Sequence, residues 1–216
     1  MARVAGRTFT REEVAEAAWR VIVREGLDRT SVRAIGRELG ASSGVVTYHF
    51  RDKTELLSFA LDRLTAAIER AVDQAAAGAE GIERVRRTMA AILPTGPREV
   101  AGWRIWIAFL GQSIGSARLG AEHGRRLEIL SERLTTQLGD LARRGAIREG
   151  LDARAEADAL IAFADGIGVG NLLRPALFPP ERQIELIDQY LVERLGATLP
   201  RPARKAQSQK AGPRRL

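Results

Sequence analysis

The chain contains no cysteine, which excludes disulfide bonds, thiolate catalysis and cysteine-ligated zinc. It has only two histidines, His49 and His123, too few for a histidine-rich metal centre. No apolar run approaches the roughly 18 residues that span a membrane, and the N-terminal residues lack the apolar core of a signal peptide. We therefore predict a cytoplasmic chain with no metal, no other cofactor and no membrane contact.

Positive charge is concentrated at the C-terminal end of the chain. The 216 residues carry a net charge of +7. Six positive charges lie after Gly196 without any acidic residue, so residues 1–195 have a net charge of only +1. Any surface for nucleic acid in the folded part must therefore be local. The basic segment 197–216 has no apolar periodicity, and we predict that it is disordered.

Strand-like alternation is also absent, and helical periodicity dominates residues 10–195. Helix signals include a capping box at Thr10 and Glu13, and stops at Gly26 and Gly40. We predict an all-α fold of about nine helices, with an N-terminal three-helix helix-turn-helix domain and a larger C-terminal bundle. The expected helices are 10–26, 32–39, 42–50, 52–77, 82–93, 98–114, 117–145, 153–176 and 180–195.

The second and third helices have the pattern of a helix-turn-helix motif. Only Gly40 and Ala41 separate them, and apolar residues on both helices would hold the pair at a fixed angle. Gly44 leaves room for close approach of a DNA backbone or a neighbouring helix. The outer face of the third helix carries groups suited to base edges and phosphate oxygens, so we predict double-stranded DNA as a partner. These groups are Ser42, Ser43, Thr47, Tyr48 and His49.

The segment TSVRAIGRELGASSGVVTYHFRDKTEL, residues 30–56, resembles the DNA-binding domain of the TetR family of transcriptional regulators. The resemblance rests on Ile35-Gly36, Gly44, Tyr48-His49-Phe50 and Lys53. It implies an N-terminal arm and DNA-binding domain over residues 1–50, connected through helix 52–77. It also implies a ligand-binding and dimerisation domain over residues 51–196. The C-terminal helices resemble the choline-responsive BetI-type branch. Thr47 departs from the pattern, because the family usually has an aromatic residue there.

Several candidate DNA contacts have alternative interpretations. Tyr48 and His49 either contact phosphate or sugar, or pack at the end of their helix. Lys53 lies in the first turn of its helix, where a cation opposes the helix dipole, which favours a phosphate contact. Arg33 is either a phosphate contact or a solvated residue, and Arg3 and Arg7 either enter a minor groove as a flexible arm or have no role. The predicted DNA contacts are Arg33, Ser42, Ser43, Gly44, Thr47, Tyr48, His49 and Lys53.

Aromatic residues gather in helix 98–114, where Trp103, Trp106 and Leu110 share one face. Such a stripe is either ordinary core or the wall of an apolar ligand pocket. Asp165 lies in an apolar segment and would need a partner if buried. His123 is interpreted as a surface or capping residue, and the alternative is a contact with the ligand. The residues predicted to bind an unidentified small-molecule effector are Trp103, Trp106, Phe109, Leu110, Ser113, Phe163 and Asn171.

The last two helices carry features typical of association between subunits. One has small residues every fourth position, and the other has an apolar stripe. Each is either intramolecular core or part of a four-helix dimer interface. We predict a homodimer, because a monomeric helix-turn-helix covers too few base pairs for useful specificity. The predicted interface residues are Ala162, Gly166, Gly170, Ile184, Ile187, Leu191 and Leu195.

Together these features predict a ligand-responsive repressor that binds a palindromic operator as a dimer. One alternative is a helix-turn-helix protein that binds DNA without responding to a ligand. The other is a small all-α enzyme. We predict that the chain is not an enzyme, because it has no cysteine, no paired histidines and no phosphate-binding loop. The glycines of Gly166–Gly170 lack the dinucleotide-binding spacing and do not follow a strand.

Overall fold

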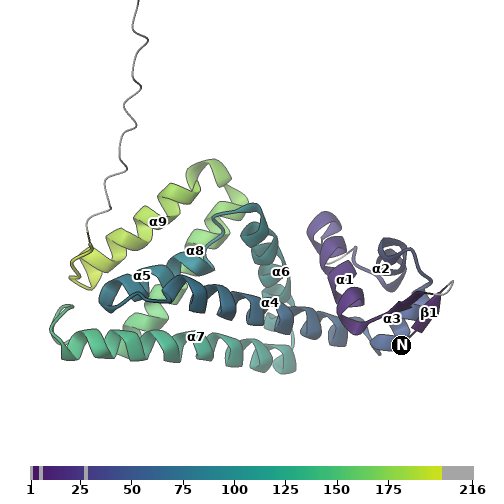
Figure 1. Ribbon diagram of the computed structural model, residues 1–216, viewed down its shortest axis with the longest axis horizontal. Coiled ribbons are helices and arrows are strands. Elements are labelled where there is room, and N and C mark those ends of the chain that lie inside the picture. The colour runs from purple at the N-terminus through teal and green to yellow at the C-terminus, as the bar shows by residue number, and fades with distance from the viewer. Residues whose placement is uncertain (1, 5–6, 27–28, 201–216) are drawn as a thin grey trace, which may run out of the picture.

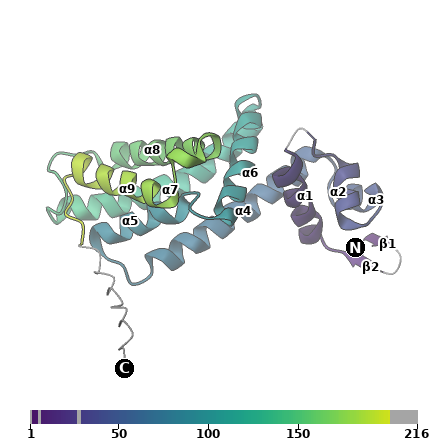
Figure 2. The ribbon, with the colours of Figure 1, turned by 90° about the horizontal axis from the view of Figure 1, so that it is seen from above.

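A computed structural model describes residues 2–4, 7–26 and 29–200 of the chain. A small N-terminal domain and a larger helical bundle are joined by one long helix, α4 (Figures 1 and 2). The small domain contains β1 (Ala2–Val4), β2 (Arg7–Phe9), α1 (Arg11–Glu25), α2 (Val32–Leu39) and α3 (Ser43–His49). The rest contains α4 (Lys53–Ala76), α5 (Gly81–Ile92), α6 (Pro97–Ile114), α7 (Ala117–Arg143), α8 (Ala153–Leu173), the 3-10 helix η1 (Pro175–Leu177), α9 (Pro180–Gln189) and the π-helix η2 (Tyr190–Arg194).

Local capping sets the ends of the N-terminal helices, as the sequence predicts. The Thr10 hydroxyl accepts a hydrogen bond from the Glu13 amide at 3.2 Å, and the Glu13 carboxylate accepts one from the Thr10 amide at 2.9 Å. Asp52 caps α4 by accepting from the Glu55 amide at 2.8 Å. Gly40 ends α2 in the left-handed conformation with φ 64°, which a glycine adopts without steric penalty.

A short hairpin precedes α1, where the sequence predicted a flexible arm and no strand. β1 and β2 pair antiparallel, with Ala2 opposite Phe9 and Val4 opposite Arg7. Strands of three residues are too short to produce a readable alternation of apolar and polar residues. The hairpin is therefore a correction to the sequence analysis, although the fold remains all-α.

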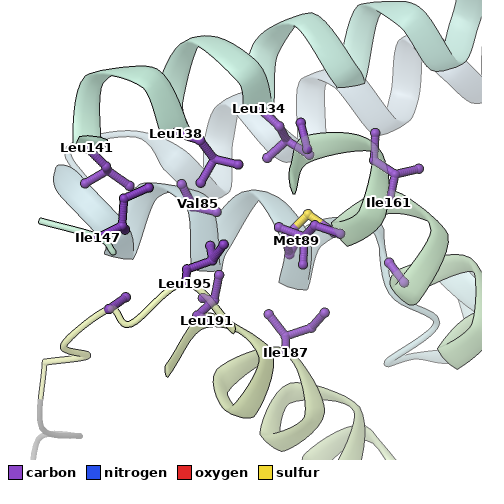
Figure 3. Packing of buried hydrophobic residues seen from close by; sticks show 14 of the residues in the cluster. Val85, Met89, Leu134, Leu138, Leu141, Ile147, Ile161, Ile187, Leu191 and Leu195 are labelled. Atoms are coloured by element: carbon purple, nitrogen blue, oxygen red, sulfur yellow. The ribbon is translucent and has the colours of Figure 1, made fainter. Parts of the chain in front are cut away.

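Three apolar clusters organise the molecule. One fills the N-terminal domain and contains Phe50, buried as predicted. A second fills the bundle, where α5, α7, α8 and α9 converge (Figure 3). The third contains Ile22 of α1, Leu61 of α4 and Phe109 of α6. This third cluster joins the two domains. Because residues of α1, α4 and α6 pack together in it, a displacement of α6 would also displace its neighbours in α1 and α4.

Polar contacts tie α4 to α7 along most of its length. The Ser58 hydroxyl donates to Glu122 at 3.1 Å, Arg126 pairs with Asp62, and Arg133 pairs with Asp73 at 2.6 Å. Because α4 leads directly into the N-terminal domain, these contacts link the position of that domain to the bundle.

The C-terminal elements depart from the sequence analysis in two places. The eighth helix ends at Leu173 and not at residue 176, because Pro175 disfavours a helical conformation at Arg174. The predicted disordered tail starts too early, because Ala197 is buried and its amide donates to the Leu191 carbonyl at 3.0 Å. Residues 201–216 of that tail lie outside the described residues. Among the described helices, none is long and apolar enough to cross a membrane.

Candidate nucleic-acid interface and effector site

The outer face of α3 is open to solvent. Ser42, Ser43, Gly44 and Thr47 are exposed, and the Tyr48 side chain is 62% exposed. Ser42 is the N-cap residue of α3, and its side chain makes no capping hydrogen bond. The Thr47 hydroxyl donates within the helix, to the Gly44 carbonyl at 3.2 Å. The structure therefore brings these five predicted residues together on one accessible surface.

His49 is held more firmly than the other residues of this face. Its Nε2 lies 2.9 Å from the Phe9 carbonyl oxygen, and its ring meets the Tyr48 ring edge-on at 5.1 Å between centroids. Because a carbonyl oxygen only accepts, Nε2 carries the proton and donates it. His49 thus connects the end of α3 to β2. The side chain of the predicted contact Lys53 lies outside the described residues, as do those of Arg3 and Arg7, for which an arm in the minor groove was one of two alternatives.

A pocket of about 480 Å³ lies between α2 and α3. Arg33, a predicted contact, lines it together with Arg37, which the sequence analysis missed. The sequence signal for Arg37 was its position four residues after Arg33, because this spacing puts both guanidinium groups on the same face of α2. Two arginines beside exposed hydroxyl groups suit a phosphate group. The lining residues are Ser31, Arg33, Arg37, Ala41 and Ser43.

Gly36 keeps α2 and α3 close. A Cβ at this position would lie 3.0 Å from the Ala41 carbonyl oxygen and 3.2 Å from the Ser43 amide nitrogen. Any larger side chain would push the turn away from α2. The Ile35-Gly36 pair therefore serves packing, and it fixes the angle at which α3 is presented.

The aromatic residues of α6 contact different neighbours and do not form one wall. The Trp103 ring lies against the backbone of Gly168 in α8, and its Nε1 donates to the Ile92 carbonyl at 2.7 Å. The Trp106 ring packs on His123 of α7 with 4.2 Å between centroids. Phe109 belongs to the cluster shared by the two domains. An effector that binds among these residues must therefore displace side chains.

Neither of two pockets on the described surface is lined by any of the seven predicted ligand residues. The larger, of about 680 Å³, lies where the end of α4 meets α5 and α7. Ser113 is buried and its hydroxyl donates to the Phe109 carbonyl at 2.9 Å, while Leu110 is partly buried.

His123 is buried, with 5% of its surface exposed, so its prediction as a surface or capping residue is wrong. It lies four residues after the buried Leu119 and continues the inner face of α7. Its Nδ1 has no hydrogen-bond partner among the described residues. Burial lowers the pKa of His123, and the nearby Arg126 lowers it further, which favours a neutral ring.

Asp165 is a partly buried carboxylate on α8 without an ion pair or hydrogen bond to the described residues. Burial raises its pKa to about 6. Asp165 precedes Gly168, against which the Trp103 ring lies, by three residues on α8. A partly buried carboxylate without a counter-ion among the described residues favours a cation as its partner.

Two further predicted ligand residues face other elements. The Phe163 ring packs on Tyr190 of η2, with 5.2 Å between centroids. The Asn171 side-chain amide donates to the Phe178 carbonyl at 2.9 Å, which closes the turn after α8. Asn171 therefore has an internal structural partner, and Phe163 packs on η2.

The predicted dimer residues divide into buried and exposed sets. Ile187, Leu191 and Leu195 are buried in the core of their own protomer (Figure 3), and Ile184 packs against the same core. Gly170 is covered by Phe178, because a Cβ there would lie 2.7 Å from that ring. Gly170, Ile187, Leu191 and Leu195 are thus buried by their own protomer and leave no surface for a second subunit, whereas Ile184 is only partly buried and its place in the interface stays a prediction. Ala162 and Gly166 remain exposed.

Comparison with known protein families identifies both parts of the chain. Residues 14–58 match the model described as bacterial regulatory proteins, tetR family. Residues 81–196 match the model described as BetI-type transcriptional repressor, C-terminal. The chain belongs to the TetR family. This TetR-family protein is a DNA-binding transcriptional regulator, as the helix-turn-helix pattern predicted, and the same family assignment confirms the prediction that it is not an enzyme.

Individual relatives support the same assignment. The HTH-type transcriptional regulator PksA of Bacillus subtilis is 26% identical over 183 residues, which cover 84% of this chain and 87% of PksA. The regulator BetI of Serratia proteamaculans is 24% identical over 203 residues, covering 93% of this chain and all of BetI. A putative transcriptional regulator from Saccharomonospora viridis in complex with choline has the same fold, with TM-score 0.80, 24% identity and coverage of 86% of this chain and 96% of that one.

Proposed function

We propose that this TetR-family regulator is a dimeric repressor that binds a palindromic operator and is released by a small organic cation. The observation that carries the DNA-binding part is the exposed face of α3 beside the arginine-lined pocket of α2. Base-edge contacts come from α3, and Arg33 and Arg37 hold the flanking phosphates.

An exposed apolar stripe on α8 supports the dimer. Its members are spaced alternately by four and three residues, which is the spacing of a helix–helix seam. Leu173, at one end, is 75% exposed, and a Cβ at Gly166 would meet no atom of the protomer within 4 Å. A second copy is the partner that fits, because two copies present two recognition helices to a palindrome. The stripe consists of Ala155, Ala159, Ala162, Gly166, Val169 and Leu173.

Asp165 and Trp103 support a cationic effector. A buried unpaired carboxylate is unfavourable until a positive charge compensates it, and an indole face binds ammonium groups. A regulator of the same fold is in complex with choline, which is a quaternary ammonium compound. Binding requires the side chains around Trp103 to move, so the effector favours a rearranged bundle over the one that binds DNA.

The connection to DNA runs through α6 and α4. Phe109 of α6 packs in the same cluster as Ile22 of α1 and Leu61 of α4, so a shift of α6 moves the recognition helix. A tenfold loss of operator affinity needs a coupling free energy of about 1.4 kcal/mol. Repacking one aromatic side chain is sufficient to supply it.

The experiment begins with selection of duplexes from a random DNA library by the full chain. We expect an enriched palindromic sequence, bound by a dimer in sedimentation. If the selection enriches no sequence, operator binding is contradicted. Choline and tetramethylammonium are then titrated into the complex, and each should lower operator affinity in the wild type but not in Asp165→Asn. If neither cation changes operator affinity or tryptophan emission, the cationic effector is wrong while operator binding stands.

A further inference from the structure

We propose that His123 makes operator binding sensitive to acid, because a proton on its buried ring disrupts the packing that joins the bundle to the recognition helix. A positive charge at this place favours the rearranged bundle that releases DNA, so acid acts in the same direction as the effector. This inference rests on the proposed function, because it needs the packed bundle to be the form that binds the operator.

His123 lies beside the cluster that joins the two domains. Its ring stacks on Trp106 of α6 with 4.2 Å between centroids, and the Phe109 ring of the same helix is 6.1 Å away. Trp106 and Phe109 pack in the cluster that also contains Ile22 of α1 and Leu61 of α4. A change in the packing of α7 on α6 at His123 therefore reaches both α1 and α4, which hold the DNA-binding domain.

The surroundings of His123 suit a neutral ring. The residue is buried, and its Nδ1 has no hydrogen-bond partner among the described residues. A protonated imidazole carries an N–H on both ring nitrogens, so Nδ1 would hold a buried donor without an acceptor. Contact with the Trp106 ring offsets only part of this cost, because burial also removes the water that hydrates the charge.

The charged neighbours do not compensate a proton on His123. Arg126 follows one turn later on α7, and its positive charge opposes protonation. Asp62 of α4 is already paired with Arg126, and Glu122, which precedes His123, already accepts from Ser58 of α4. The cluster residues that α1 and α6 contribute are apolar and aromatic. Burial and Arg126 therefore both lower the pKa of His123 in the packed bundle.

This lowered pKa fixes the direction of the response. The packed bundle binds the proton of His123 more weakly than a bundle in which the ring meets water. The packed form keeps its full advantage above the ordinary histidine pKa of about 6.5 and loses part of it as pH falls from there toward the lowered pKa. At pH 5.5 the rearranged form gains at most about tenfold per protomer, because one pH unit below the ordinary pKa corresponds to a factor of about ten.

The first test measures operator affinity at pH 8.0 and pH 5.5 for the wild type and for His123→Phe and His123→Gln. Neither variant can be protonated at this position, and phenylalanine keeps a ring beside Trp106. The wild type should lose several-fold more affinity than either variant between the two pH values. His49, Asp165 and the DNA titrate in all three proteins, so the difference isolates His123. An equal or smaller loss in the wild type would overturn the proposal. Circular dichroism at both pH values establishes that the proteins are folded.

The second test follows the proton by NMR. His49 is the only other histidine of the chain, so His49→Gln identifies which imidazole C2–H signal belongs to His123. We expect His123 to titrate with a pKa below its ordinary value of 6.5, and lower in the operator complex than in free protein. A pKa of His123 that is the same in both forms would contradict the coupling. A wild type that selects no operator refutes the proposed function, whereas identical pH profiles on a bound operator refute only this inference.

Discussion

Replacing Asp165 by asparagine removes a partly buried charge with little change in the shape of the side chain. The carboxylate has no partner among the described residues, and burial raises its pKa from 3.8 to about 6. Each unit of pKa shift corresponds to 1.36 kcal/mol, so the ionised form destabilises the folded state by at most about 3 kcal/mol. We therefore expect Asp165→Asn to be more stable than the wild type at pH 8, by about 1–3 kcal/mol.

The pH dependence follows from the raised pKa. Between pH 4 and pH 6 the folded state binds more protons at Asp165 than the unfolded state does, so this carboxylate makes stability fall as pH rises. Above about pH 6 its unfavourable contribution is constant. The advantage of Asp165→Asn should therefore be near zero at pH 4 and largest at pH 7–8. The assay is urea and thermal unfolding, in which about 1–3 kcal/mol raises the melting temperature by about 2–12 °C for a chain of this size.

Asp158→Asn is the matched control on the same helix. Asp158 accepts hydrogen bonds from the Ser131 hydroxyl at 2.5 Å and from Arg154 at 2.9 Å, and these contacts lower its pKa. The control should therefore lose stability at pH 8, opposite in sign to Asp165→Asn. Equal or lower stability of Asp165→Asn at pH 8 would refute the reasoning, because it would mean that the ionised carboxylate is well compensated in the protein without effector.

Other variants test the dimer, the phosphate contacts and the switch. Gly166→Glu should sediment as a folded monomer, whereas Gly124→Glu, at an equally open helical position on α7, should remain a dimer. If Gly166→Glu is still a dimer, the apolar stripe of α8 is not the dimer interface. Arg37→Gln should weaken binding to all duplexes alike and reduce the salt slope by about 1, and a change confined to one sequence would instead indicate base contact. Trp106→Ala should reduce the release of operator DNA by choline but leave the operator affinity measured without choline near the wild-type value. Titrations with and without choline measure both quantities. If choline releases this variant as fully as the wild type, the Trp106–His123 contact has no part in the switch.

The helices were predictable because their ends are encoded locally. The Thr10–Glu13 capping box, the Asp52 cap and Gly40 each act through residues within one turn, so a sequence pattern is enough to find them. The same holds for the exposed face of α3, whose polar residues follow from helical periodicity. The hairpin escaped prediction because its attachment depends on His49, 40 residues away from Phe9.

The C-terminal sites were less predictable, because apolar periodicity does not say which neighbour an apolar face meets. Leu191 and Gly166 lie in equally convincing patterns, yet Leu191 fills the protomer core and Gly166 faces outward. Trp103 and Trp106 share a helix face, but α8 receives one ring and α7 the other. Packing between distant segments decides these outcomes, and a single sequence does not record it.

The most direct test of the account is the affinity of Tyr48→Ala for the selected operator, measured by fluorescence anisotropy across a salt titration. Tyr48 is the most exposed large residue of the α3 face. Loss of a phosphate or sugar contact should weaken binding to the operator and to scrambled duplexes alike, while Thr47→Ala should change the preferred sequence. Wild-type affinity of Tyr48→Ala at every salt concentration would contradict the assignment of α3 as the recognition helix.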